Sequence, residues 1–115
     1  MQFEIAIYAP DSGKAPYKQW SQRLSKAMQA IVATRLARLR HGNFGDCKPL
    51  SGARGVYELR LQVGPGYRIY YGKSGDTLVI LLCAGDKSTQ KRDIEKAKEL
   101  WAEWLQTQKE GRHNG

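Results

Sequence analysis

The sequence holds few of the residues that build disulfide frameworks and metal centres. Only two cysteines and two histidines occur among its 115 residues. Cys47 and Cys83 form no CxxC pair, and neither has a histidine at the spacing of a metal-binding motif. Each is therefore expected to be a free thiol, buried or incidental, and a structural zinc site is not expected.

Long hydrophobic runs are missing as well. No apolar run approaches the roughly 20 residues that cross a membrane, and the amino-terminal segment MQFEIAIYAP contains an acid but no leading basic stretch. The segment is thus unlike a signal peptide, and we expect a cytoplasmic protein that does not bind membranes. The length and the hydrophobic content of 41% predict a single domain over residues 1–115, with a polar tail from about Gln106 that frays.

The chain contains fewer acidic than basic residues. Eleven Asp and Glu stand against nineteen Lys and Arg, which gives a formal net charge of +8 at pH 7. This balance favours an anionic partner, and nucleic acid is the commonest partner of a small basic domain. Charge alone does not separate RNA from DNA or from an acidic protein, and a basic surface that only contacts solvent is the remaining alternative.

The first half of the chain is expected to contain a strand followed by two helices. Residues 2–9 alternate apolar and polar side chains, as in a half-buried strand. Pro16 is typical of the first turn of a helix. Lys26–Arg40 has the apolar spacing of a second helix, with Ser25 as its cap, so the two helices are expected to form an αα-hairpin. Residues 41–54 are predicted to be a loop.

The second half is expected to contain three strands and a helix. Residues 55–84 hold three strand-like runs joined by two glycine-containing turns, which predicts antiparallel hairpins. Residues 77–84 are almost wholly apolar, as in a central strand buried on both faces. A helix follows to about Gln108, capped by Ser88 or Thr89. The fold class is α+β, in the order β-α-α-β-β-β-α: a small antiparallel sheet packed on one face by the helical hairpin and the C-terminal helix.

Four polar side chains are predicted to share one face of this sheet. Strand alternation places Glu58 and Arg60 together in the first of the three runs, and Arg68 and Tyr70 together in the second. Two guanidinium groups, a carboxylate and a phenol are the groups needed to hold a phosphodiester and to move a proton near it. The residues alone therefore indicate an anion-binding surface with a candidate proton donor or acceptor.

Three motifs resemble those of a known superfamily. ELR at residues 58–60, YRIYY at 67–71 and GDKSTQ at 85–90 look like the RelE/ParE toxin superfamily, closest to the phage Gp49-like, HigB-related addiction-module killer proteins. GDKSTQ followed by DIEKAKELW is the pattern most specific to that group, whereas ELR and YRIYY mark the superfamily more broadly. The resemblance extends over roughly residues 3 to 105.

The resemblance implies the toxin of a type II toxin–antitoxin module. Relatives of RelE and HigB enter the ribosomal A site and cut mRNA without a metal or other cofactor, by attack of a ribose 2′-OH on the adjacent phosphate. By motif position, Arg60 and Arg68 are expected to hold the scissile phosphate, with Lys87 adding positive charge. This is chemistry that fixed cationic donors favour, because the transition state concentrates negative charge on phosphate oxygens.

The residues that transfer protons are indicated less directly than those that hold the phosphate. Glu58 is expected either to act as the base or to form an ion pair with the neighbouring arginines. Tyr70 is expected either to stack on a base or donate a proton, or only to pack within the sheet. YoeB-like relatives use a histidine near the C-terminus, but His113 lies beyond the part of the chain that resembles the superfamily.

The remaining expectations concern partners and alternatives. Lys48, Gln90 and Lys91, with Arg35 and Arg38 on the second helix, are candidates for contacts with mRNA or the ribosome; the alternative is that they only contact solvent. By analogy, the cognate antitoxin is a HigA-like helix-turn-helix protein, and DNA binding belongs to it and not to this chain. A ParE-like gyrase poison and a non-catalytic antitoxin-binding regulator remain as alternative functions.

Overall fold

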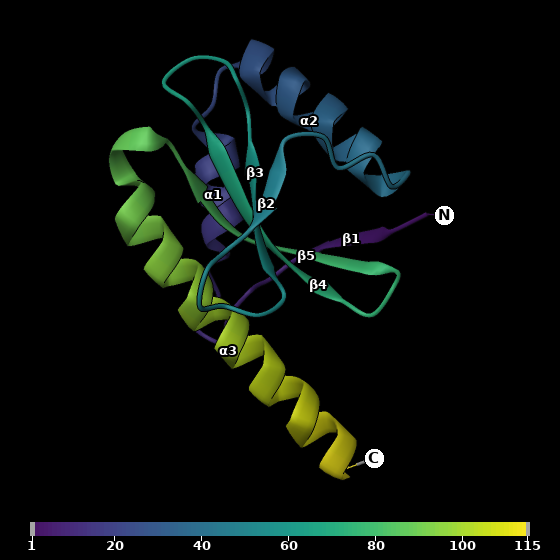
Figure 1. Ribbon diagram of the computed structural model, residues 1–115. Helices are drawn as coiled ribbons and strands as arrows, with labels where there is room; N and C mark the ends of the chain where they lie inside the picture. The colour runs from purple at the N-terminus through teal and green to yellow at the C-terminus, as the bar shows by residue number, and fades with distance from the viewer. Residues whose placement is uncertain (1, 115) are drawn as a thin grey trace.

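The protein is built on a five-stranded sheet with helices on both of its faces (Figure 1). The structure is a computed structural model that describes residues 2–114, and side chains as far as residue 110. The elements in chain order are β1 (Glu4–Ile7), α1 (Pro16–Gln22), α2 (Lys26–Arg40), β2 (Cys47–Pro49), β3 (Val56–Arg60), β4 (Arg68–Ser74), β5 (Leu78–Gly85), a short 3₁₀ turn η1 (Lys87–Thr89) and α3 (Gln90–Asn114).

The sheet confirms the predicted α+β class and differs from the prediction at one edge. Its strands lie in the order β1-β5-β4-β3-β2. β1 runs parallel to β5, and each of the other neighbouring pairs is antiparallel. The segment 41–54 was expected to be a loop, but Cys47–Pro49 within it pairs with β3. A strand of three residues has too little alternation to be recognised in the sequence, and only its pairing with β3 makes it a strand.

The expectation that all helices cover one face of the sheet is wrong. In β5, Val79 and Leu81 pack in a cluster with residues of α1 and α2. Ile80 and Leu82 pack in a second cluster with residues of α3. Because successive side chains of a strand point to opposite faces, α3 covers the face opposite α1 and α2. This is why β5 is almost wholly apolar: it is buried on both faces, as expected, although the middle strand of the sheet is β4.

The helical hairpin follows the local signals in the sequence. Pro16 lies in the first turn of α1, where its missing N–H costs no hydrogen bond. Ser25 caps α2, and its hydroxyl oxygen accepts a hydrogen bond from the Met28 N–H at 3.2 Å. Only residues 23–25 separate the two helices. The predicted helices and the predicted cap are confirmed.

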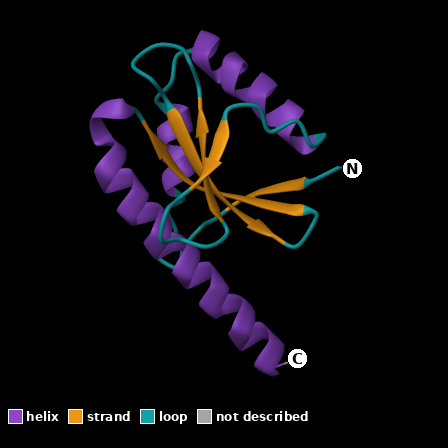
Figure 2. Cartoon of the chain, in the orientation of Figure 1, coloured by secondary structure: helices purple, strands orange, loops and turns teal. Residues whose placement is uncertain are grey.

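The last helix begins and ends differently from the prediction. A capping box precedes it: the Asp86 carboxylate accepts a hydrogen bond from the Ser88 N–H at 2.8 Å, and the hydroxyl of Thr89, one of the two expected caps, accepts one from the Asp86 N–H at 3.3 Å. The short turn η1 then leads into α3. The helix continues past Gln108 to Asn114, so its second half extends beyond the sheet (Figure 2). The fraying of the tail stays a prediction, and His113 lies outside the residues whose side chains are described. Within residues 2–114, none of the helices has the length and apolar character needed to cross a membrane.

Gly72 is a point of close approach between the sheet and α3. A methyl group at this position in β4 would overlap the indole of Trp101. We expect Gly72→Ala to lower the free energy of unfolding by about 1–3 kcal/mol, as overpacking of a filled core does. Urea unfolding measures the change, and an unchanged midpoint would contradict the packing of α3 on β4 described above.

Candidate functional site

Strand register brings the four predicted side chains to one face of the sheet. In the antiparallel pair of β3 and β4, Glu58 lies opposite Tyr70 and Arg60 lies opposite Arg68. Tyr70 belongs to the cluster packed against α3, which identifies the face. The alternation of side chains in two strands was sufficient to predict this arrangement, because directly opposite residues of a sheet share a face.

Glu58 is completely buried and is held by basic and amide side chains. Its Oε2 accepts a hydrogen bond from Gln90 Nε2 at 2.8 Å and lies 3.6 Å from Arg68 Nε. Its Oε1 lies 3.8 Å from Lys48 Nζ. Of the two roles expected for Glu58, the structure therefore contains the ion pair. A carboxylate with no exposed surface has no direct contact with an RNA substrate, and its contacts fix Arg68, Lys48 and Gln90 around it.

Tyr70 is also completely buried, which rules out one of its expected roles. Its ring has no free face on which a base can stack, and its hydroxyl has no hydrogen-bond partner among the described side chains. Burial, together with the nearby Glu58 carboxylate, raises the pKa of Tyr70 well above its usual value. Tyr70 is therefore a neutral packing residue beside Glu58, in keeping with the second of the two roles expected for it.

Arg60 is positioned by a residue that the sequence did not single out. Its Nε and Nη2 donate to Asp46 Oδ1 at 3.2 and 3.0 Å, and Gln62 Nε2 donates to Asp46 Oδ2 at 2.8 Å. The bond from Gln62, and then the bond and charge of Arg60, lower the pKa of Asp46. Asp46 precedes β2, so its contact with Arg60 depends on the strand pairing that the sequence did not reveal. No local motif marks it.

Arg60, Arg68 and Lys87 line one pocket of about 460 Å³, here called the basic pocket. Its remaining walls come from the β3–β4 connection. Arg68 Nη1 donates to the Gly66 carbonyl at 2.8 Å, and the backbone N–H of Lys87 reaches the Pro65 carbonyl at 3.4 Å. Gly66, with a φ of 77°, lies between the two: a Cβ there would be 3.4 Å from Arg68 Nη1 and 3.5 Å from Lys87 Cβ. These are ordinary contact distances, so glycine is favoured here by its positive φ, which lets the backbone turn between the two cations.

The basic pocket can hold an anion. Its lining contains three cationic side chains and no carboxylate. The Arg68 side chain is only 13% exposed, so its charge is less screened than a surface charge. Two planar guanidinium groups and an ammonium group suit the several oxygens of a phosphate. Tyr67, just before β4 begins, also lines this pocket.

The five candidates for RNA or ribosome contacts lie in three different places. Lys48 and Gln90 both contact the buried Glu58, but the Lys48 side chain is 51% exposed and Gln90 is only partly buried. Lys91 is exposed in the first turn of α3. Arg35 and Arg38, on α2, line a separate pocket next to the basic pocket.

The buried tyrosines predict a loss of stability at alkaline pH. Burial raises the pKa of Tyr17 to about 12 and raises the pKa values of Tyr70 and Tyr71 as well. Above pH ~10 the unfolded chain loses these protons while the folded chain keeps them, so stability falls as pH rises, by about 1.4 kcal/mol per pH unit for each tyrosine. Urea unfolding between pH 8 and 11 measures the slope. Tyr70→Phe is expected to make it shallower above pH 10, and an identical slope would contradict the burial of the hydroxyl.

A family match extends over most of the chain. Residues 19–102 match the model of the phage-derived protein Gp49-like family, a RelE/HigB-like toxin family. The chain belongs to this family. The matched range contains the whole basic pocket and the Glu58 cluster, so the site described above is part of what the Gp49-like family model covers.

The chain is also similar to one protein in sequence and to one solved structure in fold. An uncharacterized protein of Haemophilus influenzae is 45% identical over 85 residues, which is 73% of this chain and 84% of that protein. A free-state mutant of the E. coli toxin RelE superposes with a TM-score of 0.64 at 15% identity, over 86% of this chain and 98% of that one. At this identity the second likeness establishes the RelE fold, and the chemistry has to be argued from the residues present here.

Proposed function

We propose that this protein is the toxin of a type II toxin–antitoxin module and that it cuts mRNA bound to the ribosome without a metal ion. The observation that carries the proposal is the basic pocket, in which Arg60, Arg68 and Lys87 face the same space of about 460 Å³. Membership of a RelE/HigB-like toxin family supports the toxin class. The nuclease activity rests on the charge and geometry of the pocket.

In the proposed reaction a ribose 2′-OH attacks the adjacent phosphorus, and the bond to the 5′-oxygen of the next nucleotide breaks. The products are a 2′,3′-cyclic phosphate and a free 5′-hydroxyl. Negative charge grows on the phosphate oxygens in the transition state, where Arg60 and Arg68 donate hydrogen bonds and Lys87 adds a third positive charge. Glu58 acts as a positioning residue, because its carboxylate lies 3.6 Å from Arg68 Nε and holds that side chain toward the pocket.

The antitoxin in this proposal is a small HigA-like helix-turn-helix protein encoded next to the toxin. It would offer acidic side chains to Arg60 and Arg68 at the rim of the basic pocket, since complementary charge gives both specificity and rapid association. The neighbouring reading frame tests this directly. A helix-turn-helix gene that adjoins or overlaps this one supports the module, and purification of the two chains as a complex tests the contact.

Expression of the chain without an antitoxin tests the function in cells. We expect translation to stop, and primer extension to map breaks in translated mRNA that disappear when ribosome binding to that mRNA is blocked. Intact mRNA together with a loss of DNA supercoiling would instead identify a gyrase poison. Normal growth with intact mRNA would leave the chain as a non-catalytic antitoxin-binding regulator, and both results would overturn the proposal.

A further inference from the structure

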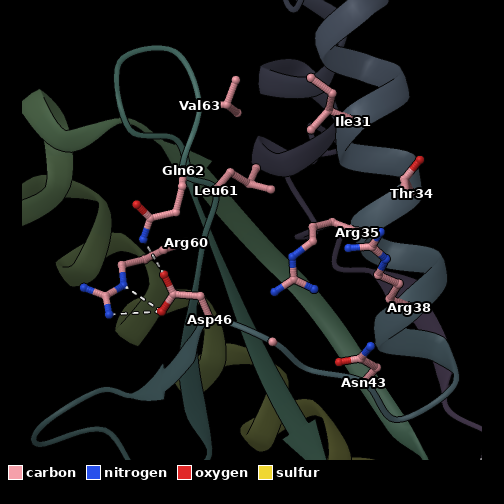
Figure 3. Close-up of a pocket in the computed structure, with 11 residues that line it drawn as sticks. Ile31, Thr34, Arg35, Arg38, Asn43, Asp46, Arg60, Leu61, Gln62 and Val63 are labelled. Carbon is pink, nitrogen blue, oxygen red and sulfur yellow. Dashed lines mark hydrogen bonds and ion pairs between the residues drawn. The ribbon is translucent and has the colours of Figure 1, made fainter.

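A second pocket, of about 480 Å³, adjoins the basic pocket. We call it the α2 pocket, because α2 forms one wall and the end of β3 with the following loop forms the other (Figure 3). The two pockets share the segment Arg60–Val63 in their linings. A strand of nucleic acid with one phosphate in the basic pocket therefore has a continuous path past Arg60 into the α2 pocket.

The α2 pocket is basic, and one of its cations is fixed in place. Arg35, Arg38 and Arg60 line it, against the single carboxylate of Asp46. Arg35 Nη2 donates to the Phe44 carbonyl at 2.6 Å, and a side chain on Gly45 would overlap the Arg35 guanidinium. Figure 3 shows Arg35 extending from α2 toward Asp46 across the pocket. Because residue 45 is a glycine, the Arg35 guanidinium has room beside the backbone. Its N–H groups that are not bonded to the Phe44 carbonyl face the pocket.

The same pocket has an apolar side. Ile31, on α2, is 40% exposed and lines the pocket. Leu61 and Val63 line the pocket from the other wall. An exposed isoleucine next to guanidinium groups suits a ligand that has one flat, apolar part and one anionic part. A nucleotide has this combination, because its base packs on apolar surface while its phosphate accepts hydrogen bonds from arginine.

We propose that the α2 pocket binds the nucleotide that neighbours the scissile phosphate in single-stranded RNA. Arg38 and Arg35 hold its phosphate, and its base lies against Ile31. This inference rests on the proposed function, since the basic pocket is taken as the place of cleavage. The volume lies in the range of small-molecule sites, and the shared wall explains why RNA fits better than a separate acidic peptide.

Binding of a short single-stranded RNA that carries 2′-deoxy nucleotides, and so cannot be cut, tests the proposal by fluorescence anisotropy at several salt concentrations. We expect Arg38→Gln to weaken binding about fivefold to tenfold and to make the salt dependence shallower by about 0.7 in the log–log slope, the value for one lost phosphate contact on a single strand. Ile31→Ala is expected to weaken binding without a change in slope, because it removes an apolar contact only.

Arg40→Gln is the matched control, since Arg40 lies in the same last turn of α2, is exposed, and is absent from the lining of the α2 pocket. Equal effects of Arg38→Gln and Arg40→Gln, no measurable binding by the unmodified chain, or a loss of antitoxin binding with RNA binding intact would each overturn the proposal. Cleavage on ribosomes is scored separately. If Arg38→Gln cleaves normally and binds RNA as the unmodified chain does, only the proposal for the α2 pocket is contradicted. If the unmodified chain binds RNA through this pocket but does not cleave mRNA, the proposed nuclease activity is contradicted and the RNA site is retained.

Discussion

Replacement of Arg68 by alanine is expected to lower the rate of ribosome-dependent mRNA cleavage by about 100-fold or more. A fixed donor to the charge that develops in a transition state typically contributes a factor of that size. The Arg68 side chain is 13% exposed, against 38% for Arg60, and it is oriented by both Glu58 and the Gly66 carbonyl. The rate of mRNA breakage on purified ribosomes measures the effect.

Arg68→Ala also removes a neighbour of the buried Glu58 carboxylate, so its stability has to be measured beside its activity. Loss of one partner of a buried ion pair costs about 3–5 kcal/mol, and Lys48 and Gln90 remain to offset part of it. Lys87→Ala keeps the assignment testable, because Lys87 is exposed and its loss leaves the Glu58 cluster intact. We expect it to slow cleavage at least tenfold with unchanged unfolding, whereas Arg54→Ala, exposed and outside both pockets, should change neither.

Trp101 is expected to contribute more to stability than the other residues of α3. It is 6% exposed, stacks on Trp104 with ring centroids 4.9 Å apart, and lies against Gly72 of β4. Its Nε1 donates to the Arg54 carbonyl at 3.1 Å. We expect Trp101→Ala to lower the free energy of unfolding by about 3–5 kcal/mol, because it leaves a cavity in the core between α3 and the sheet. Urea or thermal unfolding measures the change.

Trp104 provides the comparison for that prediction. It is only partly buried and lies one turn after Trp101 in α3. Trp104→Ala should cost clearly less than Trp101→Ala, since less apolar surface is re-exposed to water. Equal losses for the two variants would contradict the packing described for α3, and would mean that the stacked pair contributes as a unit instead of through Trp101 and Gly72.

Local patterns in the sequence were sufficient for the helices and for the shared face of the site. Alternation in β3 and β4 put Glu58, Arg60, Arg68 and Tyr70 together, and Pro16 marked the first turn of α1. These features depend on side chains a few residues apart, where period and turn chemistry decide the structure. The resemblance of the three motifs to the RelE/ParE superfamily was confirmed by the family match and by the fold.

Features that depend on distant contacts were not visible in the sequence. Cys47–Pro49 forms the strand β2 because it pairs with β3 at the edge of the sheet. Asp46 contacts Arg60 only because of that pairing. The opposite placement of α3 and the helical hairpin follows from the two-sided burial of β5, which an apolar run alone does not assign to particular helices. Complete burial of Tyr70 removed its expected role in base stacking, since depth in the fold is a tertiary property.

The site that results has two layers with different roles. Below the surface, Glu58 and Tyr70 are fully buried, and Glu58 contacts Arg68, Lys48 and Gln90. At the surface, three cationic side chains line the basic pocket. The residues of both layers lie within the range that matches the family model. A phosphate in that pocket would meet two guanidinium groups already held in place, Arg60 by Asp46 and Arg68 by Glu58 and the Gly66 carbonyl, so little reorganisation of these groups would be needed when the transition state forms.

Cleavage of a defined mRNA by the purified chain, in the presence and absence of programmed ribosomes, tests the central claim most directly. The account predicts breaks in the ribosomal A site that leave a 2′,3′-cyclic phosphate and a 5′-hydroxyl, that persist when divalent ions are removed from the chain beforehand, and that fall about 100-fold in Arg68→Ala. Intact mRNA on ribosomes with the unmodified chain, or equal cleavage by Arg68→Ala and Arg54→Ala, would contradict it.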